Sequence, residues 1–114
     1  MSDDLFLKII DREIPADIVF ENDEILAFRD IDPQAPVHIL IIPKRRIPTI
    51  NDLDSGDREL AGNMLLAARD IARAEGLSED GYRLVFNCNP NGGQSVYHIH
   101  LHLLGGRRMT WPPG

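Results

Sequence analysis

Three of the four histidines in this chain are separated by single apolar residues, in the segment HIHLH. They are His98, His100 and His102. Side chains two residues apart on a β-strand share a face, so this spacing predicts a row of three imidazoles opposite an apolar face. Neighbouring rings would stand about 7 Å apart, which leaves room for one phosphate group or one metal ion. The pattern therefore indicates a reactive row of histidines, a metal site, or coincidence.

A metal site would require several of these imidazoles to converge on one ion. Histidines two residues apart on a strand can share a zinc ion, and His38 is a possible further ligand. The chain has no pair of cysteines, and no carboxylate lies close to the three histidines in the sequence. We therefore predict neither a bound metal nor a cofactor.

Nucleophilic attack on phosphorus suits the segment and its surroundings better. Neutral imidazole is a nucleophile at neutral pH, and its phosphoryl adduct can be hydrolysed again. A second imidazole can stabilise the developing charge or donate a proton. The preceding loop, residues 88–94, contains two adjacent glycines, which allow backbone N–H groups to approach a phosphate closely. Gln94 and Ser95 add side-chain donors.

Length and charge narrow the class of protein. With 114 residues, the chain is expected to form a single domain over residues 1–114. A net charge of −6 and an isoelectric point near 5.0 argue against a nucleic-acid polymer as a partner. The single cysteine, Cys88, suits a reducing compartment, and the sequence shows neither a secretory signal nor a membrane-spanning apolar run. We therefore predict a cytoplasmic protein that does not bind membranes.

One long helix is predicted from residue 56 to about residue 75. Asp54 or Ser55 can cap its start, and Gly76 is a natural C-terminal cap. Apolar residues recur at helical spacing along it and predict the side that packs on the sheet. They are Leu60, Met64, Leu65, Ala68, Ile71 and Ala72.

A short helix is predicted over residues 3–13, with Ser2 or Asp3 as its N-cap. Strands are predicted at residues 18–22, 25–31, 37–43 and 82–87 and in the histidine segment, where Val96 and Tyr97 also favour a strand. The result is an α+β fold, with a mostly antiparallel sheet of about five strands, one long helix and one short helix. Because such a sheet leaves a face and edges uncovered, we expect two copies to pair as a homodimer.

The histidine segment also resembles a known family signature. HIHLHLL, residues 98–104, matches the His-φ-His-φ-His-φ-φ pattern of the histidine-triad (HIT) nucleotide-binding superfamily, where φ is apolar. The stretches FRDIDPQAPVHILIIPK and NGGQSVYHIHLHLLGGR, with the ending WPPG, are similar to the purine-nucleoside phosphoramidase (Hint) branch. The resemblance extends from Phe6 to Gly114. The dinucleoside-polyphosphate hydrolase branch, the alternative, usually lacks this ending.

The resemblance implies roles for the catalytic residues. His100 would be the nucleophile that attacks the α-phosphorus of a nucleotide, and His102 would contact the phosphate and stabilise charge. His98 would orient the group, and His38 matches a fourth histidine beside the triad. Ser95 would hydrogen-bond the leaving group or its phosphate.

Further residues are implied to bind the nucleotide. Gly93 and Gln94 would belong to the phosphate loop, Asn87 would contact the phosphate, and Asp30 would accept the ribose hydroxyls with Ile31 beside it. The apolar slot for the base would comprise Phe6, Ile9, Ile14 and Phe28, although simple core packing explains these four residues equally well.

The C-terminal tail is implied to reach the partner subunit's site, which would give Trp111 a role in selecting the leaving group. Family members often carry a histidine before WPPG, where this chain has Thr110. We thus expect a homodimeric enzyme that hydrolyses purine nucleoside phosphoramidates, such as adenosine 5′-monophosphoramidate, through a nucleotidyl-histidine. A nucleotide- or partner-binding module with incidental hydrolysis is the alternative from another class.

Overall fold

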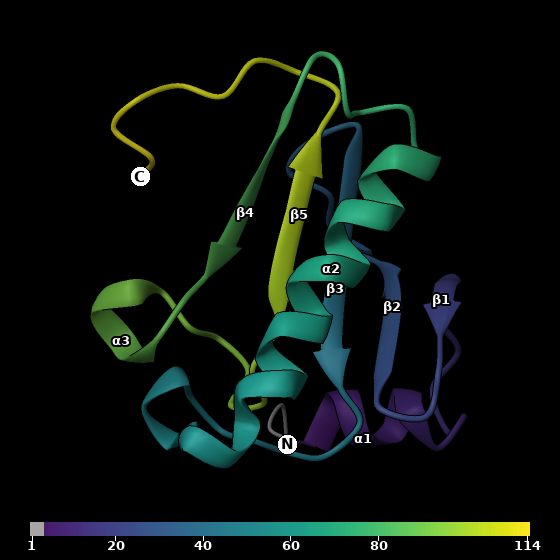
Figure 1. The fold of residues 1–114 in the computed structure, drawn as a ribbon, viewed down its shortest axis with the longest axis vertical. Helices are drawn as coiled ribbons and strands as arrows, with labels where there is room; N and C mark the ends of the chain where they lie inside the picture. The colour runs from purple at the N-terminus through teal and green to yellow at the C-terminus, as the bar shows by residue number, and fades with distance from the viewer. Residues whose placement is uncertain (1–3) are drawn as a thin grey trace.

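The computed structural model describes residues 4–114, which form one antiparallel sheet with helices packed against it (Figure 1). The strands are β1 (Ile18–Glu21), β2 (Ile25–Arg29), β3 (Val37–Pro43), β4 (Tyr82–Phe86) and β5 (Leu101–Gly105). The α-helices are α1 (Leu5–Ile10), α2 (Arg58–Ala74) and α3 (Asn89–Gly92). The strand order is β1-β2-β3-β5-β4. The predicted α+β fold with a five-stranded antiparallel sheet is confirmed, while the N-cap expected at Ser2 or Asp3 lies outside the described residues.

The predicted hairpin around Asn22 joins β1 to β2. Oδ1 of Asn22 accepts hydrogen bonds from the backbone N–H groups of Glu24 and Ile25, at 2.9 and 2.8 Å. A side chain that bonds its own backbone in this way stabilises a tight turn. The strands β2 and β3 then pair in continuous register. In the sheet, β3 lies at the centre, between β2 and β5, as its apolar sequence predicts.

The long helix begins later than predicted, because residues 55–57 form a 3₁₀ turn. Oδ1 of Asp54 accepts the N–H of Gly56, and Oδ2 of Asp57 accepts the N–H of Asp54, which caps this turn reciprocally. Gly76, with φ of 76°, follows the helix as expected. Leu65 is 48% exposed, so the prediction that it packs on the sheet with the other apolar residues of the helix is wrong. Within residues 4–114, no helix has the length and apolar character needed to cross a membrane.

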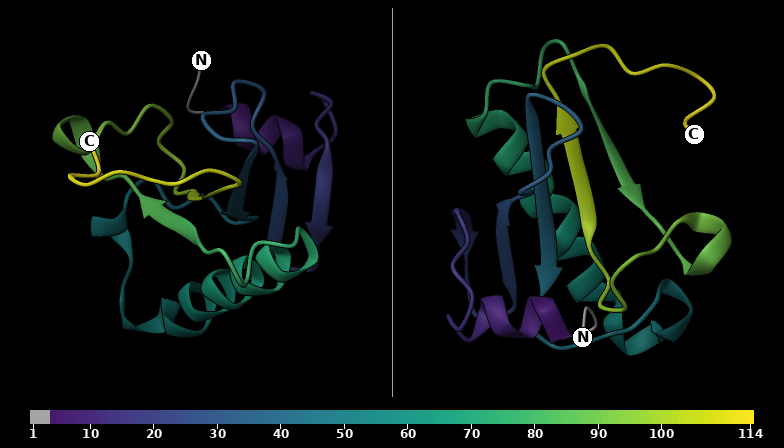
Figure 2. Two further views of the ribbon diagram at one scale, coloured as in Figure 1. Left: turned by 90° about the horizontal axis from the view of Figure 1, so that it is seen from above. Right: turned by 180° about the vertical axis from the view of Figure 1, so that it is seen from behind.

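Different helices cover the two faces of the sheet, with α2 on one side and α1 on the other (Figure 2). Alternate residues of each strand point to opposite faces. Under α2 lie buried residues of the central strands, which are Ile39, Ile41, Leu101 and Leu103. On the α1 side, Leu40 and Ile42 pack with Phe6 and Ile9. His38 and His102 alternate with the residues under α2 and therefore lie on the α1 side.

The prediction that all three clustered histidines lie on one strand is wrong. Only His102 lies in β5, which begins at Leu101. The pairing of β5 with β3 stops at Leu101. Two residues further along the same register, the segment would lie opposite Pro43, which has no backbone N–H to donate. The preceding segment bonds to the loop after β3 instead. The N–H of Ile99 donates to the carbonyl of Ile47 at 2.8 Å.

Part of the predicted loop at residues 88–94 is the short helix α3. Gly93, with φ of 80°, ends this helix in a left-handed conformation that glycine adopts without strain. The chain then turns back toward the sheet and leads into the three histidines.

Candidate active site

The four histidines converge although they lie on different elements. The ring centroids of His100 and His102 are 4.9 Å apart, and those of His38 and His102 are 5.2 Å apart. The ring of Phe6 on α1 meets the rings of His98 and His100 edge-on, with centroids 5.5 and 5.0 Å away. The fold thus gathers a compact imidazole cluster on the side of the sheet away from α2.

His98 is an anchor for the segment that carries it. Its side chain is completely buried, and Nε2 lies 2.7 Å from the carbonyl oxygen of Pro43. A carbonyl only accepts, so Nε2 carries the proton of the neutral ring. Burial lowers the pKa of His98, which favours this neutral form. Within residues 4–114, Nδ1 of His98 has no hydrogen-bond partner.

His100 has a lone pair in a defined position. Its Nδ1 lies 2.8 Å from the carbonyl oxygen of His98 and must donate to it, so the lone pair of the neutral ring is on Nε2. Burial lowers the pKa of His100, although the Asp30 carboxylate opposes this effect. A neutral imidazole with an unprotonated Nε2 is the form required for nucleophilic attack.

His102 lies between His100 and His38. Its Nδ1 is 2.9 Å from Nε2 of His38. Burial, with smaller effects from His100 and His38, lowers the pKa of His102 to about 4. His102 is therefore neutral at pH 7 and acts as a hydrogen-bonding group rather than as a fixed cation.

Asp30 lies at the edge of the imidazole cluster, just after β2. Its Oδ2 is 3.5 Å from Nε2 of His38, and its Oδ1 accepts the backbone N–H of Asp32 at 2.8 Å. Asp30 is only half-buried, so its carboxylate remains accessible to a ligand, and the neighbouring Ile31 is 98% exposed. The geometry is compatible with the ribose-binding role expected for Asp30, which stays a prediction.

The donor set around Asp30 does not suit a metal ion. Asp30, His38 and His102 offer ligand atoms within 4.8 Å of one another. However, Nδ1 of His38 accepts the backbone N–H of Gln34 at 3.0 Å. A metal on Nε2 would require a proton on Nδ1, facing that N–H, whereas metal-bound histidines normally donate from the second nitrogen. The hydrogen bond from Gln34 to His38 therefore disfavours a metal ion at this position.

Three of the residues expected to form the base slot are core residues in this structure. Phe6, Ile9 and Phe28 are buried, and the rings of Phe6 and Phe28 pack edge to face with centroids 5.7 Å apart. Ile14 is half-buried against the same cluster. Core packing, the alternative that the sequence left open, is thus observed for these residues, and contact with a base stays a prediction.

Gln94 supports the loop with its side chain. Oε1 accepts the backbone N–H of Asn89 at 2.9 Å, and Nε2 donates to the carbonyls of Pro48 and Val96 at 2.7 and 3.0 Å. These bonds correct the expectation that the amide of Gln94 is a donor for phosphate. The adjacent Ser95 is exposed and Gly93 keeps an accessible backbone, so the loop itself remains a candidate phosphate contact.

Asn87 and Trp111 lie on either side of this loop in the sequence. Asn87 follows β4 directly and is half-buried. Trp111 is 82% exposed on the tail after β5. Arg83 on β4 holds this tail, because Nη2 donates to the carbonyl of Thr110 at 2.9 Å and the guanidinium lies 6.0 Å from the Trp111 ring centroid. Contact of Trp111 with a partner subunit's site stays a prediction.

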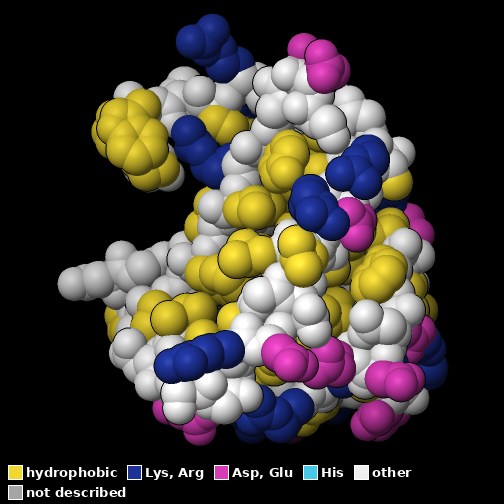
Figure 3. Space-filling view, viewed as in Figure 1, with side chains coloured by type: hydrophobic (Ala, Val, Ile, Leu, Met, Phe, Trp, Pro, Cys, Tyr) yellow, Lys and Arg dark blue, Asp and Glu magenta, His cyan; other side chains and the backbone are white. Residues whose placement is uncertain are grey.

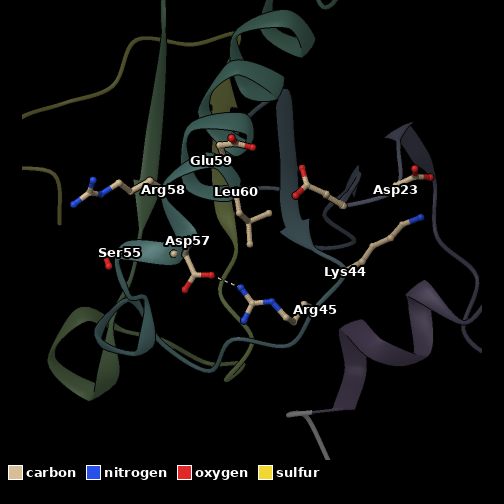
Figure 4. A pocket seen from close by; sticks show the side chains of 10 residues that line it. Asp23, Lys44, Arg45, Ser55, Asp57, Arg58, Glu59 and Leu60 are labelled. Atoms are coloured by element: carbon tan, nitrogen blue, oxygen red, sulfur yellow. Dashed lines mark hydrogen bonds and ion pairs between the residues drawn. The ribbon is translucent and has the colours of Figure 1, made fainter.

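A surface cavity of about 770 Å³ lies near the start of α2, away from the histidines (Figure 4). Two of its cations are already paired with carboxylates. Arg45 forms an ion pair with Asp57, and Lys44 lies 2.7 Å from Glu21. None of the four histidines lines this cavity, so the imidazole cluster is the better candidate for chemistry.

Sequence reasoning missed three backbone groups of the site. The N–H of Gln34 and the carbonyls of Pro43 and His98 each bind one histidine ring. No residue type marks them, because every residue carries a carbonyl and every residue except proline carries an N–H. The prolines around Gln34 were the one available signal, since they predict a fixed turn beside His38.

Comparison with known proteins finds relatives that match almost the whole chain. Residues 11–109 match the HIT domain family. A purine nucleoside phosphoramidase from Escherichia coli K12 is 58% identical over an alignment that covers 92% of this chain and 88% of the relative. An uncharacterized HIT-like protein from Synechococcus elongatus is also 58% identical, with full coverage of both chains. A HIT family hydrolase from Legionella pneumophila has a solved structure with a TM-score of 0.95 and 68% identity, covering 96% of this chain and 98% of that one.

Proposed function

The chain belongs to the HIT domain family, and from this premise we propose that it hydrolyses purine nucleoside phosphoramidates, such as adenosine 5′-monophosphoramidate. The observation that carries the proposal is the buried, neutral His100, whose lone pair is on Nε2 and whose ring lies beside His102. The relative named a purine nucleoside phosphoramidase, at 58% identity, supports the same reaction and the same purine preference.

The reaction proceeds in two steps. In the first, Nε2 of His100 forms a bond to the α-phosphorus while the bond from phosphorus to the leaving nitrogen breaks, and the leaving amine takes up a proton from solvent water. In the second, water forms a bond to the same phosphorus while the bond from phosphorus to Nε2 of His100 breaks. The attacking water gives a proton to solvent, which offsets the proton taken up by the amine, and the nucleoside monophosphate leaves with His100 restored. His102 hydrogen-bonds the phosphate and stabilises its charge. No group other than these side chains and water is needed for the balance.

The surrounding residues bind the nucleotide. Asp30 accepts the ribose hydroxyls, because an accessible carboxylate lies beside the cluster. Asn87, Gly93 and Ser95 contact the phosphate from the loop that precedes the histidines. The base lies against the apolar residues beside α1, with Ile31 as its exposed neighbour. Trp111 contributes to selection of the leaving amine.

The functional unit is a homodimer. The edge strand β4 presents Tyr82, Leu84 and Phe86, all half-buried, next to α2, and hydrophobic side chains are exposed in the strip between these elements (Figure 3). Leu65 extends this strip. Asn63 hydrogen-bonds Glu24 on the β1–β2 side, and Leu65, about 200° further around the helix, faces the opposite flank. A second copy that covers this strip would also pair the exposed edge.

The protein works in the cytoplasm on small nucleotides. A single cysteine, Cys88, suits a reducing compartment. The net charge of −6 disfavours nucleic-acid polymers as substrates.

Phosphorus NMR of adenosine 5′-monophosphoramidate hydrolysis tests the proposal, using wild type, His100→Ala and wild type with EDTA. We expect AMP release that survives EDTA and is lost in His100→Ala. Absence of turnover with AMP still bound would instead favour a nucleotide-binding module, and loss with EDTA alone would favour a metal site. Faster hydrolysis of a dinucleoside polyphosphate than of the phosphoramidate would favour the other branch of the superfamily.

A further inference from the structure

We propose that the backbone N–H of Gln34 is a positioning group that fixes the ring tautomers of His38 and His102 and thereby keeps a proton on Nε2 of His102. This inference deepens the proposed function, since it assigns what prepares His102 to hydrogen-bond a phosphate. It rests on a chain of hydrogen bonds in which each donor can be deduced from the preceding one.

The chain of hydrogen bonds starts at a group that can only be a donor. A backbone N–H donates and never accepts, and the N–H of Gln34 lies 3.0 Å from Nδ1 of His38. Nδ1 must therefore hold the lone pair, so the neutral ring carries its proton on Nε2. Burial lowers the pKa of His38, although Asp30 and Asp32 oppose this effect, which supports the neutral ring.

The proton on His38 determines the tautomer of the next ring. Nε2 of His38 lies 2.9 Å from Nδ1 of His102, so the His38 proton is donated there and Nδ1 of His102 accepts it. The neutral His102 ring then carries its own proton on Nε2, the ring nitrogen on the far side from His38. Reversal of both tautomers would place a lone pair at that nitrogen, which would repel a phosphate oxygen instead of bonding it.

Asp30 favours the same arrangement but does not impose it alone. Its Oδ2 lies 3.5 Å from Nε2 of His38, longer than a good hydrogen bond. The Gln34 contact is shorter and acts on the other nitrogen of the ring. The two groups thus act from opposite sides of His38.

The turn that presents this N–H is held by several contacts. Oδ1 of Asp30 accepts the N–H of Asp32, and Nε2 of Gln34 donates to the carbonyl of Asp32 at 3.0 Å. Nε of Arg107, beyond β5, donates to the carbonyl of Gln34 at 3.1 Å. The adjacent Pro33 restricts the backbone further. The Gln34 side chain itself is exposed, so the contact with His38 depends on the backbone and not on the glutamine.

The first test is a nitrogen-15 NMR spectrum of the histidine rings in the wild-type protein near pH 7, without substrate. Single His→Gln variants provide the assignment. We expect both His38 and His102 to be protonated at Nε2 and unprotonated at Nδ1. Protonation of either ring at Nδ1 would overturn the inference. This readout does not depend on turnover, so it stands or falls separately from the proposed phosphoramidase activity.

The second test compares Gln34→Pro with Gln34→Ala. Proline removes the N–H, whereas alanine removes only the side chain. We expect the alanine variant to keep the wild-type ring tautomers and the proline variant to show a mixture. We also expect kcat for phosphoramidate hydrolysis to be about ten- to a hundredfold lower in the proline variant than in the alanine variant. A folded proline variant with wild-type tautomers would refute the inference, and if that variant does not fold, the wild-type spectrum decides.

Discussion

The backbone carbonyl of His98 accepts the Nδ1 proton of His100 at 2.8 Å and so leaves the lone pair of His100 on Nε2. The group that prepares the proposed nucleophile is thus a main-chain atom of its neighbour. The His98 side chain has a separate task, because its ring holds the same segment to Pro43 at the end of β3. Side chain and backbone of one residue therefore anchor and orient the site together.

Substitution His98→Ala should remove the anchor while keeping the carbonyl. We expect the free energy of unfolding to fall by about 3 kcal/mol, since a completely buried ring and its hydrogen bond to Pro43 are lost. Urea denaturation measures this change. Leu66→Ala, at a half-exposed position on α2, is the control and should change stability by less than about 1 kcal/mol. Equal losses in both variants would contradict the anchoring role.

The pH dependence of catalysis should extend to unusually low pH for a histidine enzyme. Protonation of His100 removes its lone pair, and burial lowers the pKa of both His100 and His102, the latter to about 4. The usual pKa of a histidine side chain is about 6.5. Because a lowered pKa keeps the rings neutral, kcat/KM should stay level as the pH falls through this value, and should decline only at lower pH. A pH–rate profile tests this, with circular dichroism at each pH to monitor folding. An acid limb centred near the usual value would contradict it.

Substitution Asp30→Asn should weaken recognition of the ribose. A hydrogen bond from a hydroxyl to a carboxylate contributes about 1.5–3 kcal/mol, so kcat/KM should fall by about ten- to a hundredfold. Comparison of adenosine 5′-monophosphoramidate with its 2′,3′-dideoxy analogue isolates the effect, because Asp30→Asn should matter little for the analogue. Asp32→Asn, at the neighbouring exposed carboxylate, is the matched control. A similar loss on both substrates would exclude the ribose-binding role.

Substitution Gln94→Ala should loosen the loop that leads into the histidines. It removes three hydrogen bonds and leaves the carbonyls of Pro48 and Val96 without this partner, which costs about 2 kcal/mol in the free energy of unfolding. Denaturation and steady-state kinetics should show lower stability together with a higher KM. Asn91→Ala, at an exposed position in α3, serves as the control. If Gln94→Ala raised KM without loss of stability, a direct phosphate contact would be the better explanation.

Substitution Leu65→Glu should separate the proposed dimer. The new charge would lie on the flank of α2 toward β4, where burial against a second copy would require its desolvation. Sedimentation equilibrium should show a dimer for wild type and mostly monomer for this variant. Leu66→Glu, one residue further around the helix, should remain dimeric. Identical masses for wild type and Leu65→Glu would place any interface elsewhere.

Much of the local structure follows from the sequence alone. The nearly continuous apolar run at residues 37–43 predicts β3 with its observed bounds, and the Asn22 turn predicts the hairpin. Helical spacing predicts α2, apart from its 3₁₀ start and the exposed Leu65. The residue types at His98, His100, His102 and His38 also indicate a group of imidazoles, and the rings of His38, His100 and His102 lie next to one another in the structure. Short-range patterns report the strand, the hairpin and the helix because neighbouring residues determine them.

Only the tertiary structure determines the hydrogen-bond partners of the histidine rings. The start of β5 depends on Pro43, more than fifty residues earlier, which ends the pairing and leaves its carbonyl to His98. The tautomers of His38 and His102 depend on a backbone N–H that any residue other than proline would supply at position 34. Gln94 has a side chain suited to phosphate, yet the folded chain uses it to join three backbone groups. Hydrogen bonds between distant segments produce no periodic pattern in the sequence. The residue types therefore indicate which chemistry is possible, and the tertiary structure determines which atom of each residue takes part in it.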